Sequence, residues 1–319
     1  MIKNNTILSI VVPCYNEQEV IDETAKQLTD VLNELIQDKI VSSESFVLFV
    51  NDGSKDKTWE KITELYQNNK LIAGINLAKN VGHQNALMAG LYTAKSTCNA
   101  MITIDADLQD DVGAIKKMIT EFHNGNEVVY GVRSDRKKDT RFKKYSAILF
   151  YKFMSFLGTQ TVYNHADYRL LSQRAVEQLL LFREKNLFLR GIVPLIGLKS
   201  AKVYYERNER FAGETKYPFS KMLNFAIDGV TSFSVKPLRI IFVVGFLFLF
   251  LTIVMGAYIL YQYFNHNVVS GWSSLILSLW LIGSIVIISL GIIGEYIGKI
   301  YTEVKDRPRY NIESVLMRK

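Results

Sequence analysis

Two aspartates one residue apart, Asp105 and Asp107, are the most chemically specific feature of the sequence, and Gln109 adds an amide two residues later. They follow the apolar run 100–104, which has the composition of a buried β-strand. On an extended chain, side chains at positions i and i+2 point to the same face, so the two carboxylates would repel each other unless a cation lay between them. Hard oxygen ligands suit Mg²⁺ or Mn²⁺. The spacing therefore predicts a site, formed by Asp105, Asp107 and Gln109, that binds Mg²⁺ or Mn²⁺ together with a substrate diphosphate.

The Asp-x-Asp segment lies within residues 7–132, where strand-like and helix-like segments alternate. The predicted strands are 7–12, 46–50, 72–77, 100–104 and 127–132, and the predicted helices lie near 17–37, 56–68, 83–96 and 112–124. Near-continuous apolar strands that alternate with helices are typical of a parallel sheet with helices on both faces. The sequence therefore predicts an α/β fold.

Polar segments follow the first four predicted strands, at the edge where such sheets bind ligands. These segments are 13–17, 51–56, 79–83 and 105–111. Each has a simpler explanation when taken alone: residues 51–54, Asn-Asp-Gly-Ser, are typical of a turn, and Asp110 or Asp111 could cap the following helix. Their occurrence after four strands of one sheet favours a ligand site.

Neither His83 nor His165 has a Ser or Cys partner in a recognised catalytic arrangement, so we interpret both as structural or substrate-lining residues. The sequence contains no G-x-S-x-G, H-E-x-x-H or G-x-G-x-x-G segment. Serine hydrolases, zinc proteases and dinucleotide oxidoreductases need these motifs, and the sequence therefore argues against all three classes.

Residues 240–294 contain no Asp, Glu, Lys or Arg, although the chain has 38 Lys+Arg and 31 Asp+Glu among its 319 residues. This gap excludes a wholly soluble protein, and the charged remainder excludes a transporter whose mass lies in the bilayer. Two apolar spans, 240–264 and 273–294, are each long enough to cross a membrane as a helix. Lys and Arg flank the spans but are absent from the connecting segment 265–272, so the positive-inside rule places both termini and the large domain in the cytoplasm. A helical hairpin buried in a globular core is the alternative.

A basic cluster directly after the fifth predicted strand contributes to the net charge of +7; its members are Arg136, Lys137, Lys138, Arg141, Lys143 and Lys144. Next to a membrane segment, such a cluster fits anionic lipid headgroups or phosphorylated substrates better than nucleic acid, and a solvated basic loop is the alternative. The aromatic segment 145–160 that follows could lie in the membrane interface, or form a core helix or an oligomer contact. Cys14 and Cys98 are too few for a disulfide framework or a zinc site, which fits a reducing cytosol.

These motifs, in this order, resemble the family 2 inverting glycosyltransferases of the GT-A fold. Within that family the sequence is similar to the polyprenyl-phosphate sugar transferases, the group of bactoprenol-phosphate glucosyltransferases and dolichol-phosphate mannose synthase. The resemblance is carried by residues 9–19, 50–58, 80–85, 105–109, 165–170 and 207–217 and by the paired apolar spans. It implies a cytoplasmic domain with a Rossmann-like, mostly parallel sheet and two C-terminal transmembrane helices.

The expected parts of the chain follow from this resemblance and from the charge gap. They are a glycosyltransferase domain (1–217), an amphipathic juxtamembrane segment (218–239), a first transmembrane helix (240–264), a short external loop (265–272), a second transmembrane helix (273–294) and a cytoplasmic tail (295–319). We accordingly expect a multi-pass protein of the bacterial cell membrane.

The resemblance also implies a role for each matching residue. The nucleotide sugar would be bound by Pro13, Tyr15, Asn16, Glu17, Asp52, Asp105 and Ala106. Phosphates of donor or acceptor would be bound by Arg133, Arg169, Arg210 and Lys216, and the expected catalytic residues are Asp107, Asp167 and Arg133. The chain departs from the family where Asp110 and Asp111 replace frequent prolines and where Thr215 replaces a frequent Ser. Both departures keep plausible capping and hydroxyl chemistry.

The activity implied is inverting transfer of a hexose, glucose or N-acetylglucosamine, from a UDP-sugar to undecaprenyl phosphate. The product would be a lipid-linked sugar donor for a cell-wall or surface polymer. Expected partners are the membrane, a second copy of the chain in a dimer or tetramer, and a small membrane flippase, whereas nucleic acid is not expected.

We expect Asp167 to orient a cation or the acceptor, because a phosphate monoester has a second pKa of about 6 and is already mostly dianionic in the cytosol. An internal salt bridge between Asp167 and Arg169 is a simpler interpretation of the same two residues. One alternative function, a processive polysaccharide synthase, is disfavoured because the sequence has no Gln-x-x-Arg-Trp segment. The other is an inactive nucleotide-binding membrane scaffold.

Overall fold

The computed structural model describes residues 6–134, 165–185, 187–206 and 271–318, and scattered residues between 238 and 265. The chain divides into two compact units. The first comprises residues 1–148, 160–217 and 307–319, and the second comprises 149–159 and 218–306. The predicted segments 135–164 and 207–217, which include the basic cluster, Arg210 and Lys216, lie outside the described residues.

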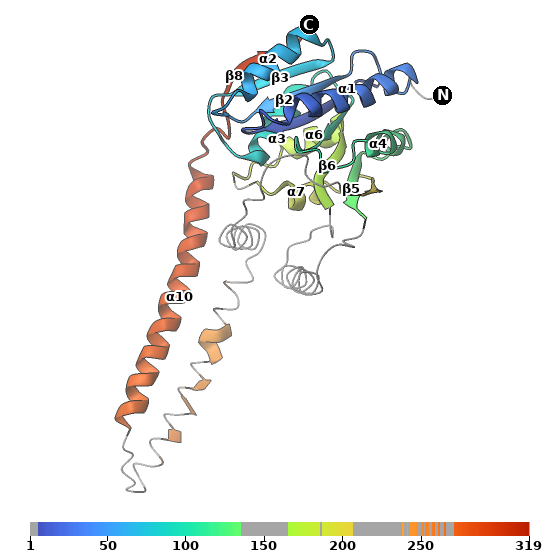
Figure 1. The fold of residues 1–319 in the computed structure, drawn as a ribbon. Helices are drawn as coiled ribbons and strands as arrows, with labels where there is room; N and C mark the ends of the chain where they lie inside the picture. The colour runs from blue at the N-terminus through green and yellow to red at the C-terminus, as the bar shows by residue number, and fades with distance from the viewer. Residues whose placement is uncertain are drawn as a thin grey trace. The chain divides into compact units, whose positions relative to one another are not determined.

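The described part of the first unit is built on an eight-stranded sheet with the strand order β7-β5-β6-β4-β1-β2-β3-β8 (Figure 1). Its strands are β1 (Leu8–Cys14), β2 (Phe46–Asn51), β3 (Ile72–Leu77), β4 (Ala100–Thr103), β5 (Val128–Arg133), β6 (His165–Ser172), β7 (Ser200–Tyr205) and β8 (Ile312–Leu316). Strands β1 to β4 are parallel to one another, as are β5 and β7, whereas β6 and β8 run antiparallel to their neighbours. The prediction of an α/β fold with a mostly parallel sheet is therefore confirmed.

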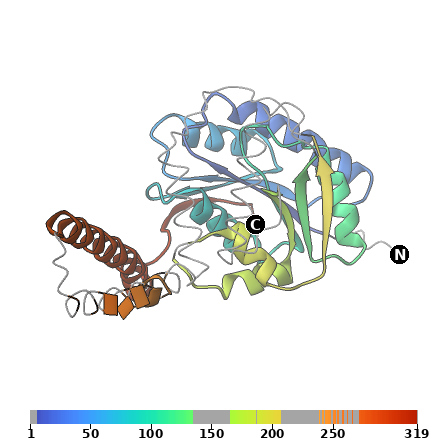
Figure 2. The same cartoon turned by 90° about the horizontal axis from the view of Figure 1, so that it is seen from below.

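Helices cover both faces of this sheet (Figures 1 and 2). They are α1 (Ile21–Gln37), α2 (Thr58–Asn68), α3 (His83–Ala94), α4 (Ala114–His123), α6 (Gln173–Leu180) and α7 (Leu189–Leu195). In α1, Leu28, Leu32 and Leu35 recur at helical spacing and are fully buried in the core, as an amphipathic helix requires. Helix α3 packs closely against β1 on the other face of the sheet. Gly90 makes this possible, because a Cβ at that position would lie 2.4 Å from Val11 Cγ1. The four helices predicted up to residue 124 are all present.

The tail expected at residues 295–319 is in fact divided between a helix and a strand. Helix α10 (Trp272–Val304) continues ten residues past the predicted end at Gly294, and β8 then pairs antiparallel with β3. The pairing joins Ile75 to Val315 and gives partners to backbone groups that β3 would otherwise leave open at the sheet edge. Strands β6, β7 and β8 were not predicted from the sequence.

Side chains also fasten the segment that follows α10 to the first unit. Arg309 Nη2 donates hydrogen bonds to the carbonyl oxygens of Phe182 and Glu184, at 2.6 and 3.1 Å. Lys185 Nζ donates to the carbonyl oxygen of Arg307 at 2.8 Å. The residues that lead toward α7 are therefore held by the chain's C-terminal segment.

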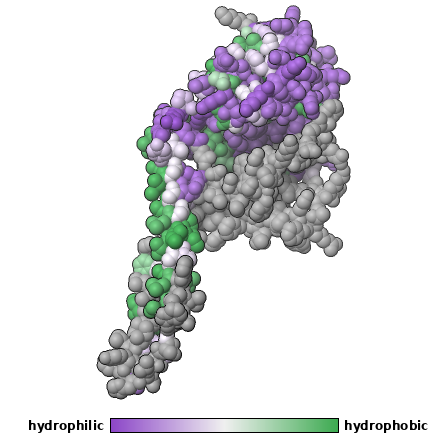
Figure 3. Space-filling model, turned by 60° about the vertical axis from the view of Figure 1, so that its left-hand side comes forward, coloured by the Kyte–Doolittle hydropathy of each residue, from purple (hydrophilic) through white to green (hydrophobic). Residues whose placement is uncertain are grey.

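Helix α10 of the second unit has the length and composition of a membrane span. Its segment Leu281–Val304 has 24 residues, a mean hydropathy of 2.0 and no buried residues, and it is the one such helix among the described residues. At 1.5 Å per residue it extends about 36 Å, enough to cross a hydrocarbon core of about 30 Å. Figure 3 shows hydrophobic side chains along this helix. The other predicted span, 240–264, lies mostly outside the described residues, and those described between 241 and 261 are helical.

Candidate active site

The polar segments after β1, β2, β3 and β4 meet at one edge of the sheet, as predicted. The segments after β1 and β2 are joined by two bonds of 2.9 Å, from Asn16 N to Ser54 Oγ and from Lys55 N to Asn16 Oδ1. The segments after β3 and β4 meet where His83 Nε2 lies 3.5 Å from Asp105 Oδ1. The parallel strands thus bring residues from four distant parts of the sequence together.

The segment proposed to hold the nucleotide base combines a buried strand end with an exposed aromatic ring. Pro13 is buried in β1, whereas Tyr15 is 42% exposed. Asn16 adopts a left-handed backbone conformation (φ 55°), and its side chain is committed to the neighbouring loop. Glu17 N donates to Thr58 Oγ1 at 2.9 Å. The structure therefore fixes the backbone of this segment and leaves the Tyr15 ring accessible to a ligand.

Asp52 is only 2% exposed, and its carboxylate holds the loop that begins α3. Its two oxygens accept hydrogen bonds from the backbone amides of Val81 and Gly82, at 2.7 and 2.9 Å. Burial raises the pKa of Asp52, and these two bonds oppose the rise. Gly53 is required beside it, because a Cβ there would lie 2.4 Å from Asn80 N. The described contacts of the Asp52 carboxylate are thus structural, and a role in binding the base stays a prediction.

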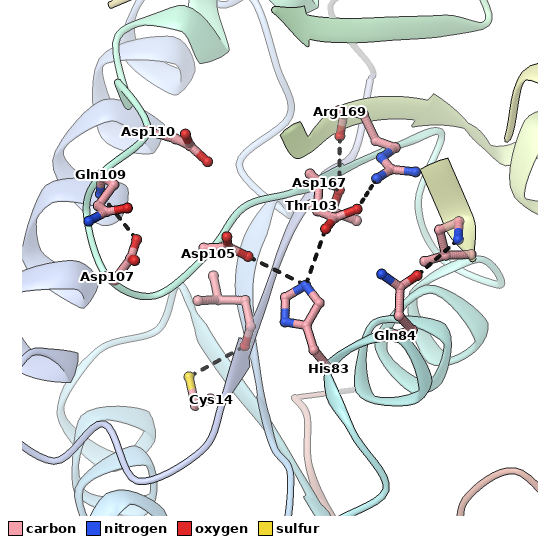
Figure 4. Close-up of polar contacts among 12 residues, drawn as sticks. Cys14, His83, Gln84, Thr103, Asp105, Asp107, Gln109, Asp110, Asp167 and Arg169 are labelled. Atoms are coloured by element: carbon pink, nitrogen blue, oxygen red, sulfur yellow. Dashed lines mark hydrogen bonds and ion pairs between the residues drawn. The ribbon is translucent and has the colours of Figure 1, made fainter. Parts of the chain in front are cut away.

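The assumption that Asp105 and Asp107 lie on an extended chain is wrong. Strand β4 ends at Thr103, residues 106–107 form a turn, and Leu108 has a positive φ of 56°. Figure 4 shows Asp105 directed toward His83, whereas Asp107 lies beside Gln109, whose backbone amide donates to Asp107 Oδ1 at 3.2 Å. The two carboxylates are therefore separated by the turn of the loop instead of standing side by side on a strand.

The loop nevertheless has the donor chemistry of a divalent metal site. Partial burial, together with the carboxylates of Asp167, Asp110 and Asp107, raises the pKa of Asp105 to about 6. This crowding of hard, negatively charged oxygen ligands is what Mg²⁺ or Mn²⁺ would neutralise. Among the described residues no group of three or more His, Cys, Asp or Glu side chains is arranged to hold a metal. The carbonyl oxygen of Ala106 accepts a bond from Thr24 Oγ1 at 2.7 Å, which is a structural contact with α1, and a role of Ala106 in binding the nucleotide sugar stays a prediction.

Asp167 lies between two guanidinium groups at the centre of the site. Arg169 Nη2 is hydrogen-bonded to Asp167 Oδ1, and Arg190 Nη2 and Nε lie 3.0 and 3.3 Å from Oδ2. Burial would raise the pKa of Asp167, but the charges of Arg169 and Arg190 outweigh it and hold that pKa well below its ordinary value. Asp167 is therefore a permanent carboxylate and a weak base. The internal salt bridge with Arg169 is present.

His83 stands between the two carboxylates that matter most in this site. Its Nε2 lies 3.5 Å from Asp105 Oδ1 and 4.0 Å from Asp167 Oδ2 (Figure 4). The neighbouring Gln84 fixes the start of α7, because its Oε1 accepts a bond from Leu189 N at 2.9 Å. The first turn of α3 thus contacts the loop after β4, strand β6 and helix α7.

Arg133 is paired with a carboxylate for which the sequence suggested capping. Asp110 Oδ1 accepts bonds from Arg133 Nη2 at 3.0 Å and from Tyr205 Oη at 2.6 Å, and Asp110 is 3% exposed. Burial would lower the pKa of Arg133, but the charge of Asp110 outweighs it and raises that pKa. Of the two aspartates, Asp111 is the one that bonds to the helix start, accepting from Gly113 N at 2.8 Å.

Sequence reasoning missed Arg190 as a site residue. It lies in the short helix α7, away from the strand ends that directed the search. Its one sequence signal is a positive charge inside the apolar run 187–196. His83 and Asp110 lay within the polar segments but were given other roles, and Gln84, one residue past the third segment, was given none.

Two family models match the chain. The glycosyl transferase family 2 model covers residues 9–180, and the GtrB C-terminal hairpin model covers residues 236–300. The chain belongs to glycosyl transferase family 2. The resemblance drawn from the motifs is thereby confirmed, and the protein is a glycosyltransferase.

Relatives of this family 2 glycosyltransferase match over nearly its whole length. It is 51% identical over 313 residues to the glycosyltransferase YkoT of Bacillus subtilis (strain 168), a match that covers 98% of this chain and 93% of that protein. It is 38% identical over 310 residues to the prophage bactoprenol glucosyl transferase homolog of Escherichia coli (strain K12), covering 97% and 99%. It is 37% identical over 309 residues to the bactoprenol glucosyl transferase of Shigella phage SfX, covering 96% and 99%.

Among solved structures, glucosyl-3-phosphoglycerate synthase from Mycobacterium tuberculosis, in complex with Mn²⁺, UDP-glucose and phosphoglyceric acid, aligns with 14% identity and a TM-score of 0.45. The alignment covers 71% of this chain and 78% of that one.

Proposed function

We propose that this family 2 enzyme transfers glucose or N-acetylglucosamine from a UDP-sugar to undecaprenyl phosphate, with inversion of the anomeric centre. The product is a polyprenyl-phosphate sugar that serves in glycosylation of a cell-wall or surface polymer. The observation that carries the proposal is that one chain joins the glycosyltransferase site at the sheet edge to the apolar, unburied segment Leu281–Val304. Two relatives named for bactoprenol glucosyl transfer, which match nearly the whole chain, support the same acceptor.

The donor is assigned to the half of the site formed by the segments after β1, β2 and β4. The accessible ring of Tyr15 packs on the base, beside Pro13. Asp105, Asp107 and Gln109 would hold Mg²⁺ or Mn²⁺ beside the diphosphate, and the cation would supply charge stabilisation for the leaving UDP. Burial and neighbouring carboxylates oppose the negative charge of Asp105. A bound cation would offset that cost, so the ionised Asp105 favours such an ion.

The acceptor supplies its own nucleophile. An oxygen of the lipid phosphate attacks the anomeric carbon while the bond from that carbon to the UDP oxygen breaks, and UDP leaves with the bonding electrons. A dianionic phosphate needs no proton removed, which agrees with Asp167 being held as a permanent carboxylate by Arg169 and Arg190. Arg133, with Arg210 and Lys216, binds phosphate groups of donor or acceptor.

The proposed topology has two membrane spans, 240–264 and 273–294, joined by the external loop 265–272. The match to the GtrB C-terminal hairpin, residues 236–300, supports this arrangement. The positive-inside rule supports a cytoplasmic site and cytoplasmic termini in a bacterial membrane. A dimer or tetramer and a small flippase are the partners we expect.

The test uses membranes that contain the full chain, undecaprenyl phosphate, Mg²⁺ and a panel of radiolabelled nucleotide sugars. We expect label from UDP-glucose or UDP-N-acetylglucosamine in the lipid fraction, with no label after EDTA treatment or in the Asp107→Ala variant. No transfer to lipid from any donor would overturn the proposal. A long polymer as product would indicate a processive synthase, and unchanged cellular function of Asp107→Ala would indicate a scaffold.

A further inference from the structure

Arg190 is the accessible member of a charged cluster in which the other members are buried. The side chain of Arg190 is 39% exposed, whereas those of Asp167 and Arg169 are 9% and 2% exposed. Two guanidinium groups on one carboxylate give this triad one excess positive charge, which the nearby carboxylate of Asp105 offsets in part at Arg190. The recorded bonds of Arg190 use Nε and Nη2, and its Nη1 bonds to no other described residue. A ligand that reaches this triad therefore contacts the positively charged guanidinium of Arg190, whose Nη1 can still donate hydrogen bonds.

The position of Arg190 is fixed from two directions. Asp167, itself held by Arg169 on β6, accepts both recorded hydrogen bonds of the Arg190 side chain. Gln84 on α3 bonds to the backbone amide of Leu189, the residue before Arg190. A guanidinium held this firmly loses little conformational entropy on binding, and its planar donors match the oxygens of a phosphate.

The geometry of an inverting reaction distinguishes which phosphate would be bound. In a single displacement the entering and leaving oxygens lie on opposite sides of the anomeric carbon, so acceptor and diphosphate occupy opposite ends of the site. Figure 4 shows Asp107 and Gln109 on one side of Asp105 and Asp167 on the other, with His83 between Asp105 and Asp167. The diphosphate is assigned to Asp107 and Gln109, which leaves the Asp167 side for the acceptor.

We propose that Arg190 binds the phosphate of the lipid acceptor and that Asp167 positions Arg190 for this purpose. The inference rests on the proposed function and names the residue that recognises its acceptor. Because the carboxylate acts through the guanidinium, Asp167 is a positioning residue for the nucleophile.

The test measures initial rates of the full chain in detergent against undecaprenyl phosphate and, separately, against the donor that the panel identifies. A hydrogen bond to a charged group contributes about 1.5–3 kcal/mol, so Arg190→Gln should raise the KM for undecaprenyl phosphate by about 10–100-fold. The KM for the donor should stay within about twofold. Arg190→Lys should fall between, because an ammonium binds phosphate without the planar fork. Arg174→Gln, on an exposed helix position of α6, is the matched control and should leave both constants unchanged.

A double variant tests the positioning role of Asp167. If Asp167 acts by holding Arg190, the acceptor KM of Asp167→Asn combined with Arg190→Gln should equal that of the worse single variant within about twofold. Independent, multiplying losses would show that Asp167 acts directly on the reaction and would overturn that part of the proposal. A rise in the donor KM, or no change in either KM, would overturn the role of Arg190.

A binding measurement with radiolabelled undecaprenyl phosphate tests the role of Arg190 without requiring sugar transfer. If the unmodified chain transfers no sugar from any donor, the proposed function fails, and lipid binding still tests Arg190. Weaker binding by Arg190→Gln than by Arg174→Gln is the expected result. Equal binding by a variant whose thermal unfolding midpoint matches that of the unmodified chain would overturn the inference.

Discussion

Asp110 and Arg133 form an ion pair that joins the loop after β4 to the end of β5, with Nη2 and Nε of Arg133 at 3.0 and 3.3 Å from the same carboxylate oxygen. Tyr205 from β7 donates to that oxygen as well, at 2.6 Å. The residue expected to bind phosphate is therefore positioned by a neighbouring carboxylate, as Arg190 is by Asp167. Arg133 and Arg190 thus both owe their placement to buried acids.

Asp110→Asn should lower the free energy of unfolding by about 2–3 kcal/mol, because it leaves the charge of Arg133 without its buried partner. The thermal midpoint should fall by about 5–10 °C. Asp111→Asn is the matched control: the amide oxygen can still accept from Gly113 N, and the change should be below about 0.5 kcal/mol. Equal midpoints for the two variants would contradict a structural role for Asp110.

Asp105→Asn should stabilise the metal-free protein at pH 7 and have no effect below about pH 4. The pKa of Asp105 is raised to about 6 by partial burial and by the carboxylates of Asp167, Asp110 and Asp107, whereas in the unfolded chain it is about 3.9. The folded state thus binds the proton more tightly, and the ionised form costs stability that grows between about pH 4 and pH 6 and then stays constant. Thermal midpoints in EDTA from pH 4 to 8 measure this cost, with exposed Asp30→Asn as control. A difference that is constant over that range would contradict the prediction.

Gly53→Ala should destabilise the protein more than Gly82→Ala. Both glycines have positive φ, 61° and 90°, so alanine is strained at either site. At Gly53 the new Cβ would also lie 2.4 Å from Asn80 N and 2.5 Å from Lys79 C, whereas at Gly82 it meets nothing within 4 Å. We expect the difference to exceed about 1 kcal/mol in chemical denaturation. A larger loss for Gly82→Ala would mean that the two loops are not packed as described.

Arg309→Gln should lower the free energy of unfolding by about 1.5–3 kcal/mol, since it removes charged hydrogen bonds to the carbonyl oxygens of Phe182 and Glu184. Arg307→Gln should be nearly neutral, because the recorded bond of Arg307 uses its backbone oxygen. Limited proteolysis between residues 181 and 188 offers a local measurement: cleavage there should become faster only in the Arg309 variant.

Local pattern predicted the first half of the fold. Strands buried on both faces give continuous apolar runs, and amphipathic helices such as α1 give apolar residues at helical spacing. Both patterns lie within a few neighbouring residues, so the elements up to residue 133 could be predicted. The strand β6 lies between β4 and β5, where Arg169 pairs with Thr103 on one side and with Tyr130 on the other. These pairings join residues that are distant in the sequence. The local pattern of residues 165–172 therefore does not predict where this strand lies in the sheet.

The site was predicted from residue types, and its geometry was not. Asp105 and Asp107 were expected at the carboxyl edge of the sheet and lie there, whereas Asp167 was expected near the acceptor from the family resemblance alone, and the roles of all three stay predictions. The side-by-side arrangement of Asp105 and Asp107 depended on where β4 ends, and β4 ends at Thr103, the last residue that it pairs with both β1 and β6. Arg190 is 23 residues from Asp167, and only the folded chain shows that the two are bonded.

The placement of β8 affects how the protein is made. A ribosome completes the apolar helix α10 before it reaches Ile312–Leu316, so the edge of the sheet at β3 stays uncovered until that helix has been synthesised. The sheet can therefore be completed only after the long apolar helix has been synthesised. An expression fragment that stops ahead of residue 236 would expose that edge permanently and invite aggregation, whereas a circularly permuted fragment carrying 307–318 would restore it.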